Sequence, residues 1–161
     1  MDHAQKTVSL LQQKGWHIAF AESCTAGLAA AALVDVPSAS SVLDVSFVTY
    51  ANSAKQHYLG VKEATLASHG AVSEETAAEM ALGVAKEAGA EVGVGISGIA
   101  GPGGGTPEKP VGTVCFGFYI KGNVSACTCL FENLSRKEVR EAAVRFVFRS
   151  LCTLLAKTDV E

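Results

Sequence analysis

Apolar strand-like runs alternate with helix-like runs over the first part of the chain, and this order constrains the fold most. The apolar run Trp16–Ala21 precedes an alanine-rich stretch over 25–33, which predicts a strand followed by a helix. A second strand-like run, Val45–Tyr50, precedes a stretch with helical periodicity that starts at Ser73. A third strand-like run, Val92–Ile96, follows that stretch. Such alternation is typical of a parallel sheet that is covered by helices.

The last third of the chain follows a different pattern. Two strand-like runs, Val111–Ile120 and Val124–Phe131, flank the turn-forming residues 121–123, which predicts a β-hairpin. A final helix with one apolar face follows Ser135. We therefore expect an α/β fold, a three-layer α/β/α sandwich. Its mixed, mostly parallel sheet should have about five strands, one of them antiparallel.

Composition narrows the class of protein. The 161 residues are 48% hydrophobic and 18% charged, as in a globular chain, and no linker divides them, so we expect one domain over 1–161. The net charge of −3 argues against a nucleic-acid or membrane-surface partner. The polar start and the short apolar runs predict a cytoplasmic protein without a membrane span. The apolar content favours a homodimer or higher homo-oligomer.

Cysteine and histidine spacing gives no metal site. The five cysteines contain no C-x-x-C pair, and the four histidines show no metal-ligand spacing. We therefore expect reduced, mostly buried thiols, no metal and no cofactor.

Ser23 is the first candidate catalytic residue, within Ala21-Glu22-Ser23-Cys24-Thr25-Ala26-Gly27. This run lies at a predicted strand-to-helix bend, where unpaired N–H groups of the helix start can bind an anion or a developing oxyanion. Cys24 is a rival nucleophile, because the same helix start would lower its pKa. Glu22 has three open roles: pairing with a lysine, orienting a substrate or capping the helix.

Lys55 is the candidate activator of that serine. Tyr50 ends a predicted strand and Lys55 lies in the first turn of the next helix, so both emerge at the same sheet edge as Ser23. A partly buried lysine loses its proton more easily and can act as a general base, and a Ser/Lys pair activates a hydroxyl without histidine. A solvated surface lysine is the open alternative.

A glycine-rich loop and two arginines are candidate ligand groups. The loop over 97–106 follows a buried strand, at the edge where α/β folds bind ligands, and its glycines let the backbone approach a phosphate. It matches no standard dinucleotide or Walker pattern, and a plain surface loop is the alternative. Arg136 and Arg140 lie one helical turn apart and share a face that could hold a phosphate or simply face solvent.

Five ordered motifs together resemble the CinA C-terminal domain family, the nicotinamide-nucleotide amidohydrolases. They are Ala21–Gly27, Phe47–Tyr50 with Asn52 and Ala54–Lys55, Gly70–Glu74, Gly95–Pro102 and Lys109–Val114. The similarity runs from about Gln5 to Leu155. It implies hydrolysis of the carboxamide of nicotinamide mononucleotide to nicotinate mononucleotide and ammonia, a step in pyridine-nucleotide recycling.

By motif position, the resemblance implies a Ser/Lys dyad with Ser23 as nucleophile, Lys55 as its base and Tyr50 near the site. We expect substrate contacts from Glu22, Thr25, Ser97, Gly98, Gly101, Gly105, Thr106 and Arg140. The chain departs from the family pattern at Ala26 and Ser46, where glycine is common, and at Ala51, where serine is common. Two other functions remain open: an amidase that uses Cys24, and a non-catalytic nucleotide-binding or competence-related interaction module.

Overall fold

A computed structural model describes residues 2–158. The strands are β1 (Ile18–Glu22), β2 (Phe47–Val48), β3 (Val92–Gly98), β4 (Thr113–Ile120) and β5 (Asn123–Leu130). The helices are α1 (His3–Lys14), α2 (Leu28–Val34), α3 (Asn52–Leu59), α4 (Glu63–His69), α5 (Glu74–Ala88) and α6 (Arg136–Lys157), with a 3-10 turn at Ala39–Ser41. None of the helices within residues 2–158 combines the length and the apolar composition needed to cross a membrane.

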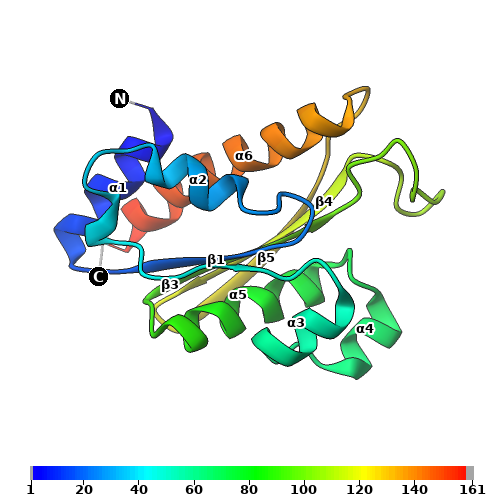
Figure 1. The fold of residues 1–161 in the computed structure, drawn as a ribbon, viewed down its shortest axis with the longest axis horizontal. Coiled ribbons are helices and arrows are strands. Elements are labelled where there is room, and N and C mark those ends of the chain that lie inside the picture. Colours follow the sequence, from blue (N-terminus) through cyan, green and yellow to red (C-terminus); the bar gives the residue numbers. More distant parts are fainter. Residues whose placement is uncertain (1, 159–161) are drawn as a thin grey trace.

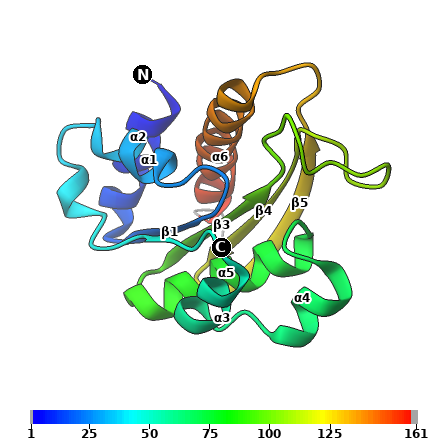
Figure 2. The same ribbon diagram turned by 45° about the vertical axis from the view of Figure 1, so that its right-hand side comes forward.

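One five-stranded sheet in the order β2-β1-β3-β4-β5 separates two helical layers. Helices α1, α2 and α6 cover one face, and α3, α4 and α5 cover the other (Figure 1 and Figure 2). Strand β1 is parallel to both β2 and β3, whereas β4 is antiparallel to its neighbours β3 and β5. The predicted three-layer α/β/α sandwich with a mixed sheet and one antiparallel strand is confirmed.

Two cores hold the layers together. The larger one lies between the sheet and α1, α2 and α6 and includes the fully buried Phe20, Phe116 and Leu151. On the other face α5 lies directly against the strands, because Gly95 and Gly117 have no side chain there. A Cβ at either position would come within 2.3 or 2.1 Å of the carbonyl oxygen of Ala77 in α5.

The helix after the nucleophile region begins later than predicted. It starts at Leu28 and not near residue 25, because the backbone is left-handed at Ala26 (φ 47°) and at Gly27 (φ 96°). Left-handed residues end regular helical geometry, and for a residue with a Cβ they cost about 1–2 kcal/mol. Ser23 therefore begins the turn that joins β1 to α2, and the two left-handed residues end this turn.

Strand β2 is also shorter than the predicted 45–50. Its ladder with β1 contains only the pairs Ala21–Phe47 and Glu22–Val48. Immediately before the ladder, the hydroxyl of Ser46 accepts a hydrogen bond from the Phe20 N–H at 3.0 Å. A side-chain acceptor therefore takes the place of a backbone partner, and the strand begins only at residue 47.

Candidate active site

Ser23 and Lys55 come together at the carboxyl ends of the parallel strands. Ser23 directly follows β1, and its N–H donates to the carbonyl of Ile96 in β3 at 3.0 Å. Lys55 lies in the first turn of α3, and its Nζ is 3.1 Å from Oγ of Ser23. Lys55 is only 1% exposed and Ser23 9% exposed. The structure therefore places a buried amine beside the candidate nucleophile, and Lys55 is not a solvated surface lysine.

The surroundings of Lys55 favour its neutral form. Nζ donates to the carbonyl oxygens of Thr49 at 2.8 Å and Tyr50 at 3.1 Å, and burial lowers the pKa of this amine. Lys55 takes part in none of the ion pairs formed within residues 2–158. A neutral amine has two N–H donors and one lone pair. A neutral Lys55 with both donors on these carbonyl groups has its lone pair left for the Ser23 hydroxyl, whereas a protonated Lys55 donates its third N–H to Oγ.

Glu22 caps helix α2. Its two carboxylate oxygens accept hydrogen bonds from the N–H groups of Ala29 at 2.8 Å and Ala30 at 3.1 Å, and the side chain is 1% exposed. Of the three roles considered for Glu22, these contacts show the capping of the helix. No ion pair within residues 2–158 joins Glu22 to Lys55, so the pairing with a lysine is wrong. The carboxylate neutralises the positive end of a helix that carries no side-chain cap of its own.

Cys24 is less suited to nucleophilic chemistry than the sequence indicates. Its side chain belongs to the main apolar core, and burial raises the pKa of the thiol to about 11. The expected lowering by the helix start is therefore wrong, because α2 begins only at Leu28 and its first N–H groups serve Glu22. At neutral pH a thiol with this pKa is almost entirely protonated.

Arg140 holds the turn that carries the candidate nucleophile. Its Nε donates to the carbonyl of Cys24 at 2.8 Å, and its Nη2 donates to the carbonyl of Thr25 at 3.3 Å. Thr25 itself is fully buried, and its Oγ1 has no hydrogen-bond partner among the described residues. Both residues thus lie beside Ser23 as expected, but the contacts that the structure shows for them are within the protein.

Arg136, which the sequence offered with Arg140 as a candidate phosphate ligand, makes contacts that the sequence did not predict. Its Nη1 donates to the carbonyl of Gly101 at 2.8 Å, and its Nη2 donates to the hydroxyl of Tyr50 at 3.2 Å. These partners lie 35 and 86 residues away along the chain. The only sequence signal was its position one helical turn before Arg140, on the same face of α6.

The glycine-rich loop contributes its first half to the site. Ser97 and Gly98 form the end of β3, beside the end of β1. Gly101 meets Arg136 as described. Gly105 and Thr106 lie in the exposed outer half, where the N–H of Thr106 donates to the carbonyl of Lys109 at 2.9 Å. Figure 2 shows this outer half projecting away from the sheet.

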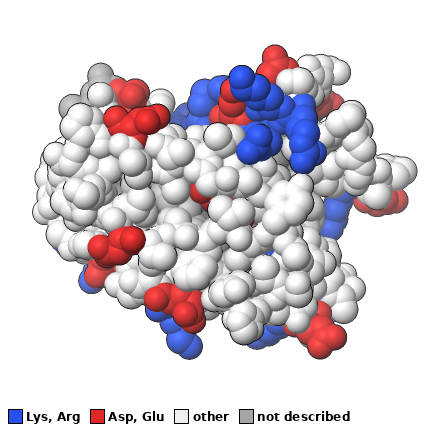
Figure 3. Space-filling model, in the orientation of Figure 1, with Lys and Arg blue, Asp and Glu red and all other residues white. Residues whose placement is uncertain are grey.

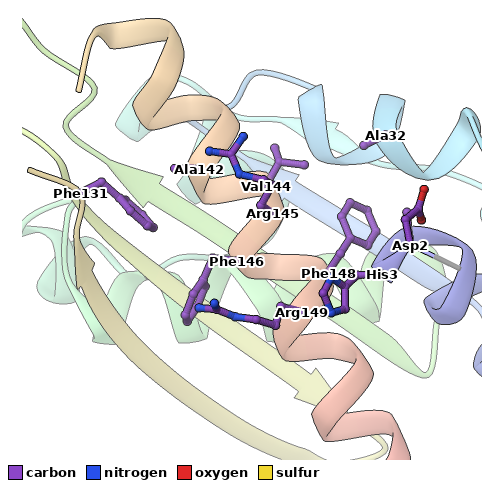
Figure 4. A pocket seen from close by; sticks show the side chains of 11 residues that line it. Asp2, His3, Ala32, Phe131, Ala142, Val144, Arg145, Phe146, Phe148 and Arg149 are labelled. Atoms are coloured by element: carbon purple, nitrogen blue, oxygen red, sulfur yellow. The ribbon is translucent and has the colours of Figure 1, made fainter. Parts of the chain in front are cut away.

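A cavity of about 600 Å³ lies elsewhere, on the outer side of α6. Its walls include the aromatic rings of Phe131, Phe146 and Phe148, with Arg145 and Arg149 beside them (Figure 4). It includes neither Ser23 nor its hydrogen-bond partners. Within residues 2–158 no three His, Cys, Asp or Glu side chains group closely enough to hold a metal ion.

Comparison with known proteins places this geometry in a family. The family model described as "CinA C-terminal domain" matches residues 1–155. The chain belongs to the CinA C-terminal domain family. A relative from Enterobacter agglomerans, named nicotinamide-nucleotide amidohydrolase PncC, is 58% identical over 137 residues, which are 84% of this chain and 83% of the relative. A CinA-like protein from Desulforapulum autotrophicum is 58% identical over 70% of this chain, which spans only 27% of that longer protein.

Solved structures of similar proteins share the fold over nearly the whole chain. The competence/damage inducible protein CihA from Agrobacterium tumefaciens has a TM-score of 0.91 and 41% identity, covering 94% of this chain and 93% of its own. A CinA superfamily protein from Klebsiella pneumoniae has a TM-score of 0.92 and 37% identity, covering 96% of both chains.

Proposed function

We propose that this chain hydrolyses the carboxamide of nicotinamide mononucleotide, giving nicotinate mononucleotide and ammonia. The observation that carries the proposal is the 3.1 Å contact between Nζ of Lys55 and Oγ of Ser23, in surroundings that lower the pKa of the amine. A base of this kind suits an acyl-transfer reaction through a serine. The 58% identity to a nicotinamide-nucleotide amidohydrolase supports this substrate class.

In the first step Lys55, neutral in the resting site, takes the hydroxyl proton of Ser23 while Oγ bonds to the carboxamide carbon. The electron pair of the C=O bond moves to oxygen, and the resulting oxyanion needs N–H donors. The N–H of Ala26 donates to the carbonyl of Ser23 itself. The Thr25 N–H is therefore the donor that we propose for the oxyanion, where a donor typically contributes roughly 3 kcal/mol.

In the second step the protonated Lys55 returns its proton to the departing nitrogen, the C–N bond breaks and ammonia leaves. Water then attacks the acyl-serine and gives its proton to Lys55, which passes it back to Ser23 as the ester bond breaks. The carbonyl groups of Thr49 and Tyr50 keep Nζ at one position throughout this cycle. A fixed amine of this kind can serve as both acid and base.

Ammonia release from nicotinamide mononucleotide tests the proposal directly. The wild-type protein should release ammonia and nicotinate mononucleotide in equal amounts. Ser23→Ala should lower kcat by at least about 1,000-fold, as for other serine nucleophiles. The matched control is Cys24→Ala at the adjacent position, which removes a thiol from the core and should leave kcat within roughly threefold of the wild-type value.

Two results would favour the other functions. Loss of activity in Cys24→Ala with retention in Ser23→Ala would assign the chemistry to the thiol, against the pKa of about 11 that burial gives it. Tight binding of the nucleotide by the wild-type protein, with no ammonia at high protein concentration, would indicate a non-catalytic binding module.

A further inference from the structure

The side chain of Arg136 crosses the end of the strand that leads to Ser23. Tyr50 follows β2 closely and Gly101 follows β3, and β1 lies between these two strands in the sheet. Arg136 contacts both residues, through Nη2 on the Tyr50 hydroxyl and Nη1 on the Gly101 carbonyl. A guanidinium anchored on the two flanking loops therefore spans the carboxyl end of β1, which Ser23 directly follows.

The two partners of Arg136 are both uncharged. The ion pairs that residues 2–158 form do not include Arg136 or Arg140. Lys and Arg side chains also gather on the surface over the N-terminal half of α6 (Figure 3), where Lys137 lies next to Arg136. Charge-assisted hydrogen bonds to phosphate are roughly twice as strong as those to neutral acceptors, and a guanidinium can make two of them side by side. An anion that reaches this guanidinium can thus displace both neutral partners.

Arg136 and Arg140 differ in their freedom to move. Arg140 is half-buried, and two of its nitrogens hold carbonyl groups of the nucleophile turn, at Cys24 and Thr25. Moving it would release the turn that positions Ser23. Arg136 is exposed, and its release frees only Tyr50 and the glycine-rich loop.

We propose that Arg136 recognises the phosphate group of the substrate and thereby determines specificity for a nucleotide over a nucleoside. On binding, its guanidinium exchanges the Tyr50 hydroxyl and the Gly101 carbonyl for two phosphate oxygens, which opens a path to the 9% exposed Ser23. Arg140 is then a positioning residue for the nucleophile. This inference rests on the proposed amidohydrolase function.

The test compares two substrates with the same carboxamide, nicotinamide mononucleotide and nicotinamide riboside, which lacks the phosphate. Arg136→Gln should lower kcat/KM for the mononucleotide by roughly 100-fold, the effect of losing two hydrogen bonds to a charged group. Its kcat/KM for the riboside should stay within roughly threefold of wild type. Lys157→Gln, the matched control, removes an exposed charge at the far end of the same helix and should change neither value.

An equal loss on both substrates would overturn the inference, because Arg136 would then act only by holding Tyr50 and the loop. An unchanged kcat/KM for the mononucleotide would overturn it as well. If the wild-type protein hydrolyses neither compound, the proposed function fails, and calorimetry with the same compounds tests Arg136 separately. The mononucleotide should then bind more tightly than the riboside to the wild-type protein, and Arg136→Gln should abolish that difference. A difference that is absent from the wild-type protein, or that survives in the variant, would refute phosphate recognition by Arg136.

Discussion

Lys55 joins the chemistry of the site to the stability of the protein. A lysine that is buried without a carboxylate partner is costly to protonate, and burial accordingly lowers its pKa. In the unfolded chain the same amine has its usual pKa of 10.5. The unfolded state therefore binds the extra proton over the pH range between the two values, so the free energy of unfolding rises with pH across that range.

A pH series on Lys55→Met tests this linkage. As pH rises toward 10.5, the wild-type protein should gain stability relative to the variant, measured as the midpoint of urea unfolding. In the wild-type protein kcat/KM should rise with pH as Lys55 becomes neutral, and this rise should be complete below pH 10.5. A stability difference that is independent of pH, or that shrinks as pH increases, would contradict the lowered pKa.

The sequence predicted individual site residues unevenly. Ser23 and Lys55 could be placed together because both follow parallel strands, and such strands end at the same sheet edge. The partners of Arg136 could not be predicted, because they arrive from loops 35 and 86 residues away. The role of Glu22 stayed open, because a carboxylate before a helix can serve a cap or a substrate equally well.

Helix α2 depends on an acceptor that lies outside the helix. The N-cap residue of this helix makes no side-chain capping hydrogen bond. Glu22, at the end of β1, caps the helix instead, because its carboxylate accepts hydrogen bonds from the N–H groups of Ala29 and Ala30. Because Ser23 directly follows Glu22, the same contact fixes the strand end that carries the nucleophile. One buried carboxylate thus positions a helix and a catalytic turn together.

Glu22→Gln should weaken this contact by removing the charge at constant shape. We expect a loss of about 2 kcal/mol in the free energy of unfolding, from urea denaturation. The glutamine oxygen can keep one of the two hydrogen bonds as a neutral one, the NH2 group cannot accept the other, and the helix dipole loses its counter-charge. The matched control is Glu138→Gln in the capping box of α6, where the carboxylate is exposed and the loss should be clearly smaller. Equal losses in the two variants would show that burial adds nothing to the cap of α2.

Element boundaries were harder to predict than the elements themselves. The apolar and alanine-rich periods fixed which segments are helices and strands. The left-handed backbone at Ala26 moved the start of α2, and an alanine gives no sequence signal for such a conformation. The hydroxyl of Ser46 shortened β2 by taking the amide of Phe20, a competition that depends on tertiary contact.

At the scale of the whole molecule the two sheet edges differ. Edge strand β2 is two residues long, whereas edge strand β5 has eight residues without a charge or a proline. Proteins protect a long edge strand with charged residues or prolines, or they pair it with another strand. We propose that β5 pairs antiparallel with β5 of a second copy, about a two-fold axis at Cys127. This register sets the exposed Val124 opposite Leu130 of the second copy, so two apolar side chains cover each other.

Oxidative crosslinking tests this dimer. Opposite residues in an antiparallel pair have Cα atoms roughly 4.5–5.5 Å apart, which a disulfide can span. Mild oxidation should therefore give a disulfide-linked dimer on a non-reducing gel, and Cys127→Ser should remove it. Cys129→Ser, two residues along the same strand, is the control that should retain the dimer. A monomer by light scattering at high concentration, or crosslinks that survive Cys127→Ser, would exclude the β5 interface.

The hydrogen bonds from Arg140 in α6 to the turn after Ser23 have a consequence for biosynthesis. Ser23 leaves the ribosome early, but Arg140, which holds its turn, is made more than a hundred residues later. Helix α1, at the beginning of the chain, likewise packs against α6 at its end. The nascent chain therefore carries Ser23 without the side chain that holds its turn. Under the proposed function, incomplete chains would be inactive until the final helix is made.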